Sequence, residues 1–187
     1  MSKFIVAIVA LVTFAAAAPV SAEYLPDGQE QRDVVPSRDM IVDYLAGEGY
    51  VLSRLELREY SPDPVEDLIK IATTESHDNQ VRSRAIESLG LYRQDARVSE
   101  TLGEMVDTMS TRTPLFSVAL HSYAHVHGEA GAETVAEYLD ADDAQIRMTA
   151  VVSLGRFGGQ TGFDILRDRQ DAEQDDQVRA RIESYVR

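Results

Sequence analysis

Apolar residues recur along this chain at the spacing of an α-helix. One phrase places an apolar residue at the start and two more at four and eight positions later, as in Val81, Ala85 and Leu89. Residues four apart lie on one face of a helix, so the phrase predicts a helix with a narrow buried stripe. Successive copies begin 34, 31 and 32 residues apart, at Val81, Leu115, Ile146 and Val178.

A less regular helical pattern precedes each copy, and helix-start residues separate the segments. These starts are Asp63 before Pro64, Thr113 before Pro114, Asp143 and Asp175. A fixed period of about 30 residues is typical of stacked helical hairpins, each of which buries its apolar face against its neighbours. The sequence therefore predicts hairpins over residues 63–91, 96–127, 131–158 and 160–187. Two phrases end in Gly90 and Gly155, where we expect left-handed backbone geometry at a helix C-terminus.

Ahead of residue 63 the pattern is weaker and predicts one degenerate helix pair. Its apolar positions are Met40, Ile41, Tyr44, Leu45, Val51, Leu52 and Leu55, with Gly47 and Gly49 in the turn. Terminal repeats are often atypical because one of their faces meets water. We therefore expect residues 38–187 to form one all-α domain and residues 23–37, which have little periodicity, to form an extended segment.

The first 22 residues have the layout of a secretory signal peptide. Lys3 precedes an apolar run over residues 4–18, and Val20-Ser21-Ala22 is a candidate cleavage site. This run is short for a membrane span of about 20 residues, although an uncleaved N-terminal anchor is the alternative. We expect an exported protein, periplasmic or extracellular, without a membrane span after cleavage.

Two copies of the phrase carry additional residues in common. They are Asp78-Asn79-Gln80-Val81-Arg82 with Ala85 and Leu89-Gly90, and Asp143-Ala144-Gln145-Ile146-Arg147 with Ala150 and Leu154-Gly155. This pattern resembles the HEAT repeat family, in particular the short bacterial type described as phycobilisome-lyase HEAT-like. The resemblance covers residues 63–187 and implies an α-α superhelix, or solenoid, of about four hairpins. It implies little about function, because HEAT arrays serve many purposes.

The resemblance also implies an acid–base ladder along the stacked repeats. Its members would be Asp78, Arg82, Asp143, Arg147, Asp175 and Arg179. The copy that begins at Leu115 has Arg112 and Phe116 at these places, so it has lost both members together. Loss of only one member would leave the charge of the other without a partner, which is costly in a partly buried place. Loss of both members leaves no unpaired charge and is tolerable. The alternative is that the aspartates are ordinary helix caps and the arginines are surface residues.

Charge and cysteine content narrow the classes of function. The chain has 32 acidic and 18 basic side chains, a formal net charge of −14. Such a field repels nucleic acid and anionic lipid, so no nucleic-acid partner is expected. The absence of cysteine excludes disulfides, thiolate chemistry, haem attachment and cysteine-based zinc sites.

Histidines cluster in one segment and are the strongest candidates for chemistry. His121 and His125 are one helical turn apart and could hold a metal ion, with His127 or Glu129 completing the site. Their offsets place them on a surface-facing column away from the buried stripe, which favours ordinary exposed histidines. A HEAT-like enzyme of lyase or iron-dependent oxidoreductase type is the alternative function. The chain has no His-Glu dipeptide and no recognisable catalytic motif, so neither a cofactor nor catalysis is expected.

Positions off the stripe define a candidate face for binding a protein or peptide. Taken at offsets 3, 6 and 10 of the phrase, they are Arg84, Glu87, Val118, His121, Thr149, Val152, Arg156 and Arg181. Their mixture of apolar and charged groups suits a protein or peptide partner. The stripe Val178, Ile182 and Val186 in the last helix adds the expectation of self-association.

Overall fold

Short helices joined by tight turns make up the part of the chain that this computed structural model describes, residues 37–47 and 53–187. The α-helices are α1 Arg38–Ala46, α2 Arg54–Tyr60, α3 Pro64–Thr73, α4 Asn79–Leu89, α5 Ala96–Thr108, α6 Pro114–His127, α7 Ala132–Ala136, α8 Ala144–Phe157, α9 Gly159–Arg169 and α10 Asp176–Val186. The 3₁₀ segments are η1 Gly90–Tyr92, η2 Gly128–Gly131 and η3 Glu137–Asp140. These ranges contain no β-strand, which confirms the all-α prediction. The predicted signal peptide, all but the last residue of the predicted extended segment, and Gly49, Val51 and Leu52 of the predicted N-terminal pair lie outside the described residues.

Aspartates begin three of the helices at the predicted residues. Asp63, Asp143 and Asp175 each accept a hydrogen bond from a backbone N–H in the first turn of the following helix. This satisfies one of the donors that a helix start leaves without a partner. Thr113 behaves differently, because its hydroxyl donates to the carbonyl oxygen of Ser110 at 2.9 Å and gives α6 no side-chain cap.

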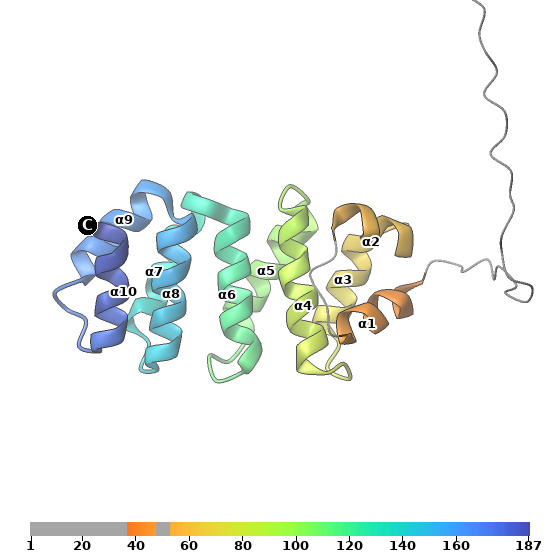
Figure 1. The fold of residues 1–187 in the computed structure, drawn as a ribbon, viewed down its shortest axis with the longest axis horizontal. Helices are drawn as coiled ribbons and strands as arrows, with labels where there is room; N and C mark the ends of the chain where they lie inside the picture. Colours follow the sequence, from red (N-terminus) through yellow and green to blue (C-terminus); the bar gives the residue numbers. More distant parts are fainter. Residues whose placement is uncertain (1–36, 48–52) are drawn as a thin grey trace, which may run out of the picture. The chain divides into compact units, whose positions relative to one another are not determined.

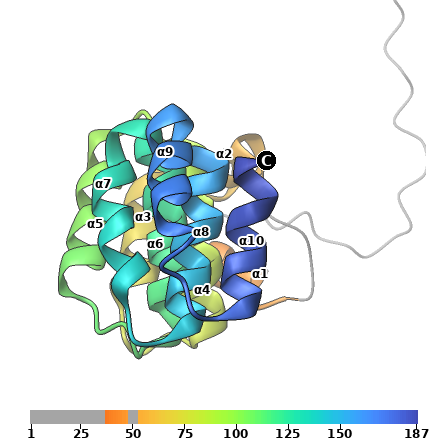
Figure 2. The ribbon, with the colours of Figure 1, turned by 90° about the vertical axis from the view of Figure 1, so that its left-hand side faces the viewer.

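The helices pair in the order of the predicted hairpins. α3 packs against α4, α5 against α6, α7 against α8 and α9 against α10. The second helices of the pairs also contact one another in sequence, α4 with α6, α6 with α8 and α8 with α10. Figure 1 shows these second helices side by side in chain order. In Figure 2, α5 and α7 lie on the opposite side of the helical layers from α8 and α10.

The repeated stripe is buried between these neighbours. Ala85, Ala119 and Ala150, at the centre of three copies, have no exposed surface. The buried apolar side chains form two clusters, one toward each end of the described chain. α6 contributes to both, with Leu115 and Ala119 in the first and Phe116, Leu120 and Ala124 in the second. One helix thus connects the two cores.

Two further expectations about apolar positions have different outcomes. In the N-terminal pair, α1 buries Ile41 and Leu45 as predicted. α2 buries Leu57, whereas Leu55 is 76 % exposed. The stripe of α10 is covered, because Val178 is 1 % and Ile182 0 % exposed within the second core. Its buried part is therefore unavailable to a second copy of the chain.

No helix in residues 37–47 and 53–187 has both the length and the apolar character needed to cross a membrane.

The glycines that end two phrases serve close packing and do not adopt left-handed geometry. Gly90 has φ −57°, and Gly155 lies inside α8. A Cβ atom on Gly155 would lie 2.5 Å from ring carbons of Tyr185 in α10. A Cβ on Gly90 would lie 2.8 Å from Nδ1 of His125 in α6. The expectation of left-handed caps is wrong, because both glycines have ordinary helical geometry and lie where a side chain of the following repeat packs against the backbone.

We predict opposite effects for alanine at two helical glycines. Gly155→Ala should destabilise the fold by about 1–3 kcal/mol, because the new methyl group overlaps the ring of Tyr185. Gly103→Ala in α5 meets nothing within 4 Å and should stabilise by about 0.5–1 kcal/mol through helix propensity. Urea unfolding followed by circular dichroism measures both. Equal effects of the two substitutions would contradict the close contact at Gly155.

Candidate functional site

A groove with a volume of about 300 Å³ opens between α4, α6 and α8. Its lining residues are Glu87, Ser117, Val118, His121, Ser122, Gln145, Met148, Thr149 and Val152. The predicted face supplies Glu87 from one repeat, Val118 and His121 from the next, and Thr149 and Val152 from a third. The structure therefore brings together residues from three copies of the phrase.

The groove has an apolar interior and one acidic group among its lining residues. Val118, Met148 and Val152 supply apolar surface, and Glu87 is exposed at the edge. Burial lowers the pKa of His121, and the positive charge of Arg156 and the neighbouring His125 lower it further. His121 is therefore neutral at pH 7, and Glu87 gives the groove a negative charge.

Three residues of the predicted face do not line this groove. Arg84 donates to the carbonyl oxygen of Leu45 at 2.7 Å and to that of Gly47, and so binds the end of α1. Arg156 in α8 and Arg181 in α10 are exposed. The groove therefore takes up only part of the predicted face and is centred on α6.

The two central histidines are half-buried, so the expectation that they face solvent is wrong. Nδ1 of His121 lies 3.1 Å from Oγ of Ser153, at hydrogen-bond distance. The ring of Phe157 packs against both histidines, with centroid distances of 5.1 Å to His121 and 4.9 Å to His125. Phe157 ends the second helix of the following hairpin, so only packing between hairpins covers these side chains.

The other two potential metal ligands interact with different neighbours. His127 stacks on Tyr123 at 4.1 Å, and its Nε2 lies 3.2 Å from Oγ of Ser99. Glu129 accepts hydrogen bonds from the backbone N–H and the hydroxyl of Thr161 at 2.9 and 2.8 Å. Within the described ranges, no three His, Asp or Glu side chains converge in a way that could hold a metal ion.

The arginines of the expected ladder bind backbone carbonyl groups. Arg82, Arg147 and Arg179 each donate to a carbonyl oxygen in the segment before their own helix, at 2.9–3.0 Å. The accepting residues are Ala72, Ala141 and Glu173. Helix ends leave such carbonyl groups without a partner inside the helix. The arginine of each copy therefore connects the end of the preceding segment to the second helix.

The aspartates of the ladder cap their own helices, as in the alternative interpretation. Asp78 and Asp143 accept from the backbone N–H two residues later at 2.7 and 2.8 Å, and Asp175 accepts from two such groups. No ion pair between described residues joins an aspartate of this set to an arginine of another copy. These aspartates thus stabilise the starts of their own helices.

The copy that lacks these residues uses aromatic side chains in their place. Phe116, at the arginine position, has no exposed surface and packs on Tyr138 at 5.0 Å. The hydroxyl of Tyr138 donates to the carbonyl oxygen of Val106 in the last turn of α5, at 3.1 Å. Tyr138 from the next hairpin thus supplies the donor that arginine supplies in the other copies.

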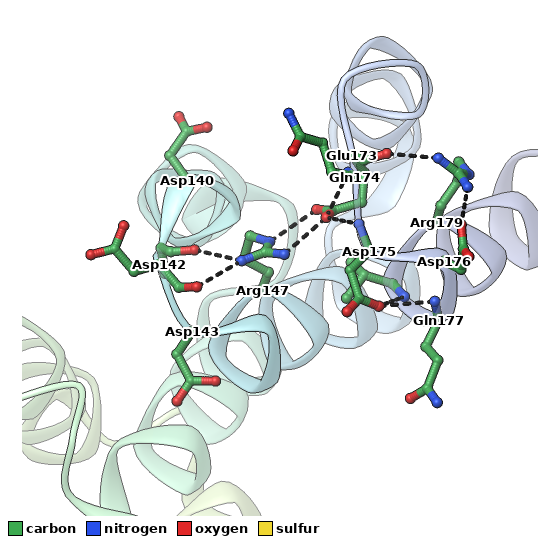
Figure 3. Close-up of polar contacts among 12 residues, drawn as sticks. Asp140, Asp142, Asp143, Arg147, Glu173, Gln174, Asp175, Asp176, Gln177 and Arg179 are labelled. Carbon is green, nitrogen blue, oxygen red and sulfur yellow. Dashed lines mark hydrogen bonds and ion pairs between the residues drawn. The ribbon is translucent and has the colours of Figure 1, made fainter.

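Glu173 is the centre of the most buried polar network in the described structure, and nothing in the sequence marks it (Figure 3). It is 3 % exposed, and each carboxylate oxygen accepts a hydrogen bond of 3.0 Å from Arg147. One oxygen also accepts the backbone N–H groups of Gln174 and Asp175 at 3.0 and 2.9 Å. Burial opposes the charged form, but these hydrogen bonds, with the charges of Arg147 and Arg169, lower the pKa of Glu173 overall.

We predict that Glu173→Gln destabilises the fold by about 2–3 kcal/mol at pH 7, because Arg147 loses its buried counter-ion. The lowered pKa of Glu173 stabilises the fold above the ordinary glutamate pKa of 4.5, and this contribution disappears as the pH falls through the folded value. The difference from the wild type should therefore narrow below pH 4.5. Urea unfolding across this pH range measures it, with the exposed Asp168→Asn as control. A difference independent of pH would contradict the ion pair.

Comparison with known proteins gives no further identification. The sequence matches no protein-family model, and no curated protein is significantly similar to it.

Proposed function

We propose that this chain is an exported, HEAT-like α-solenoid that binds a peptide segment of a partner protein in the groove between α4, α6 and α8. The repeated phrase and the successive contacts of α4, α6, α8 and α10 support the solenoid. The apolar segment at residues 1–22 supports export to the periplasm or the cell exterior.

The observation that carries the proposal is the convergence of three repeats on one concave site. A groove of about 300 Å³ is at the small end of the range for ligand sites. It suits a single large apolar side chain better than an extended organic cofactor. Val118, Met148 and Val152 provide the apolar contact surface for such an anchor. Hot spots of this kind, an apolar group in a pocket with a polar rim, dominate the affinity of many interfaces.

Charge indicates which peptide is preferred. Glu87 at the groove is exposed and forms no ion pair with another described residue. The net charge of −14 attracts a basic partner and repels an acidic one. We therefore propose a peptide with an apolar anchor residue beside a lysine or arginine.

A metal-dependent or lyase activity at His121 and His125 has less support. Both rings pack against Phe157, and Ser153 occupies Nδ1 of His121. The lowered pKa of His121 leaves an imidazole that contributes polarity to the groove. We assign it a role in shaping the peptide site.

Selection from a displayed random peptide library tests the proposal. The selected peptides should share an apolar residue next to a basic one. Val152→Arg should reduce their affinity at least tenfold in fluorescence anisotropy, because a guanidinium group fills the apolar groove. Glu104→Lys, at an exposed position of α5, changes the net charge by two units and is the control.

A second substitution separates the contribution of charge to the peptide affinity from that of the apolar anchor residue. Glu87→Gln should weaken binding about two- to fivefold, the range for an exposed ion pair. A peptide in which alanine replaces the basic residue should bind the wild type and this variant equally. Selection of acidic peptides, or unchanged affinity in Val152→Arg, would refute the proposed site.

A further inference from the structure

A second cavity, with a volume of about 510 Å³, lies between α2 and the segment that follows α4. It is lined by Arg54, Arg58, Leu91, Tyr92, Arg93, Gln94 and Asp95. It shares no lining residue with the peptide groove. The surroundings of this cavity are basic, although the chain as a whole is strongly acidic.

The three arginines of the cavity have no counter-ion among the residues that the structure describes. Arg54, Arg58 and Arg93 are exposed, and none of them forms a hydrogen bond or ion pair with any residue in the described ranges. Arginines elsewhere, such as Arg38 and Arg147, bind carboxylates at 3.0–3.1 Å. Three like charges at one cavity repel one another unless an anion lies between them.

The acidic residue of the lining does not neutralise them. Arg97, outside the cavity lining, binds Asp95 through Nη2 at 2.8 Å and through Nε at 3.1 Å. The same guanidinium group binds Asp63 at 2.8 and 3.2 Å. Hydrogen bonds from Arg97 lower the pKa values of Asp63 and Asp95. The carboxylate of Asp95 is therefore already paired with Arg97, and the cavity keeps its positive charge.

Tyr92, which lines the cavity, has a buried hydroxyl group without a partner among the described residues. It is only 7 % exposed, and its buried hydroxyl has no hydrogen-bond partner in the described structure. Buried hydroxyl groups almost always have a partner, because an unmade hydrogen bond is costly. Burial raises the pKa of Tyr92, so the phenol remains a neutral donor. The guanidinium of Arg54 lies over its ring, 5.1 Å from the centroid, which holds this arginine at the cavity.

We infer that this cavity binds a phosphate group, held jointly by Arg54, Arg58 and Arg93. A single guanidinium group can satisfy a carboxylate through two parallel hydrogen bonds. A phosphate presents three or more acceptor oxygens and up to two negative charges, which suits a cavity lined by three arginines. The distant acidic surface disfavours anions in general, so binding depends on these local contacts. The source of the phosphate is a small phosphorylated molecule or a lipid headgroup.

Calorimetric titration with pyrophosphate, at constant ionic strength with chloride as the matching salt, tests the inference. The wild type should bind pyrophosphate saturably at one site. Arg58→Gln with Arg93→Gln should weaken binding at least tenfold, because two of the three guanidinium groups are lost. Arg156→Gln with Arg181→Gln removes the same charge from exposed positions outside the cavity and should leave the affinity within twofold of the wild type.

Two further measurements complete the test. Arg58→Lys keeps the charge but loses the planar fork, so it should weaken binding less than Arg58→Gln does. If circular dichroism shows that the double variant does not fold, the comparison of Arg58→Lys with Arg58→Gln replaces it. Flotation with phosphatidylcholine vesicles containing phosphatidic acid distinguishes the sources. If the protein binds the vesicles but does not bind pyrophosphate, the site is assigned to a lipid headgroup.

Two results would overturn the inference. One is the absence of saturable binding to both pyrophosphate and vesicles. The other is an equal loss of affinity in the two double variants, which would mean that binding depends on net charge alone. Peptide binding in the groove should be unchanged in Arg58→Gln with Arg93→Gln, so the two sites are tested separately.

Discussion

The arrangement of this protein depends on how closely adjacent second helices can approach. In α4, α6 and α8 the stripe has alanine at its centre, and Ala85, Ala119 and Ala150 are completely buried, whereas α10 has the buried Ile182 at this place. Gly90 and Gly155 extend the close approach to the helix ends, where His125 and Tyr185 of the next repeat pack against them. Apolar burial is the main favourable term in folding, and a single hairpin cannot bury the apolar stripe of its second helix without a neighbouring hairpin. Cores that run from one hairpin into the next are the consequence.

A second constraint concerns the carbonyl groups at the ends of the first helices. An arginine at one position of the phrase binds these groups in three copies, through Arg82, Arg147 and Arg179. In the remaining copy, Tyr138 from the following hairpin provides the donor, and Phe116, at the arginine position, is buried against Tyr138. A requirement of the backbone is thus conserved through the repeats while the side chains that meet it change. This requirement accounts for the replacement of the arginine, whereas the aspartate is a separate helix cap that α6 lacks.

The two cavities have opposite character because different parts of the repeat surround them. The groove between α4, α6 and α8 lies beside the stripe, and so it has apolar walls and the acidic Glu87. The cavity near α2 lies where the atypical N-terminal pair meets the first regular hairpin, and there three arginines have no carboxylate partner among the described residues. The chain has a net charge of −14, so this cavity is positive only locally, where its arginines lack carboxylate partners among the described residues.

The sequence by itself determined the all-α class, the helix pairs to within a few residues and the aspartate caps, because these depend on the helical period and on contacts within a single turn. It also located most of the groove, since positions three and six residues from the stripe lie on a neighbouring face of any helix. Only the tertiary structure decided the environment of His121 and His125, the roles of Gly155 and Tyr138, and the burial of Glu173. Those depend on partners about 26–32 residues away, and local periodicity carries no information about which side chain a neighbouring hairpin places there.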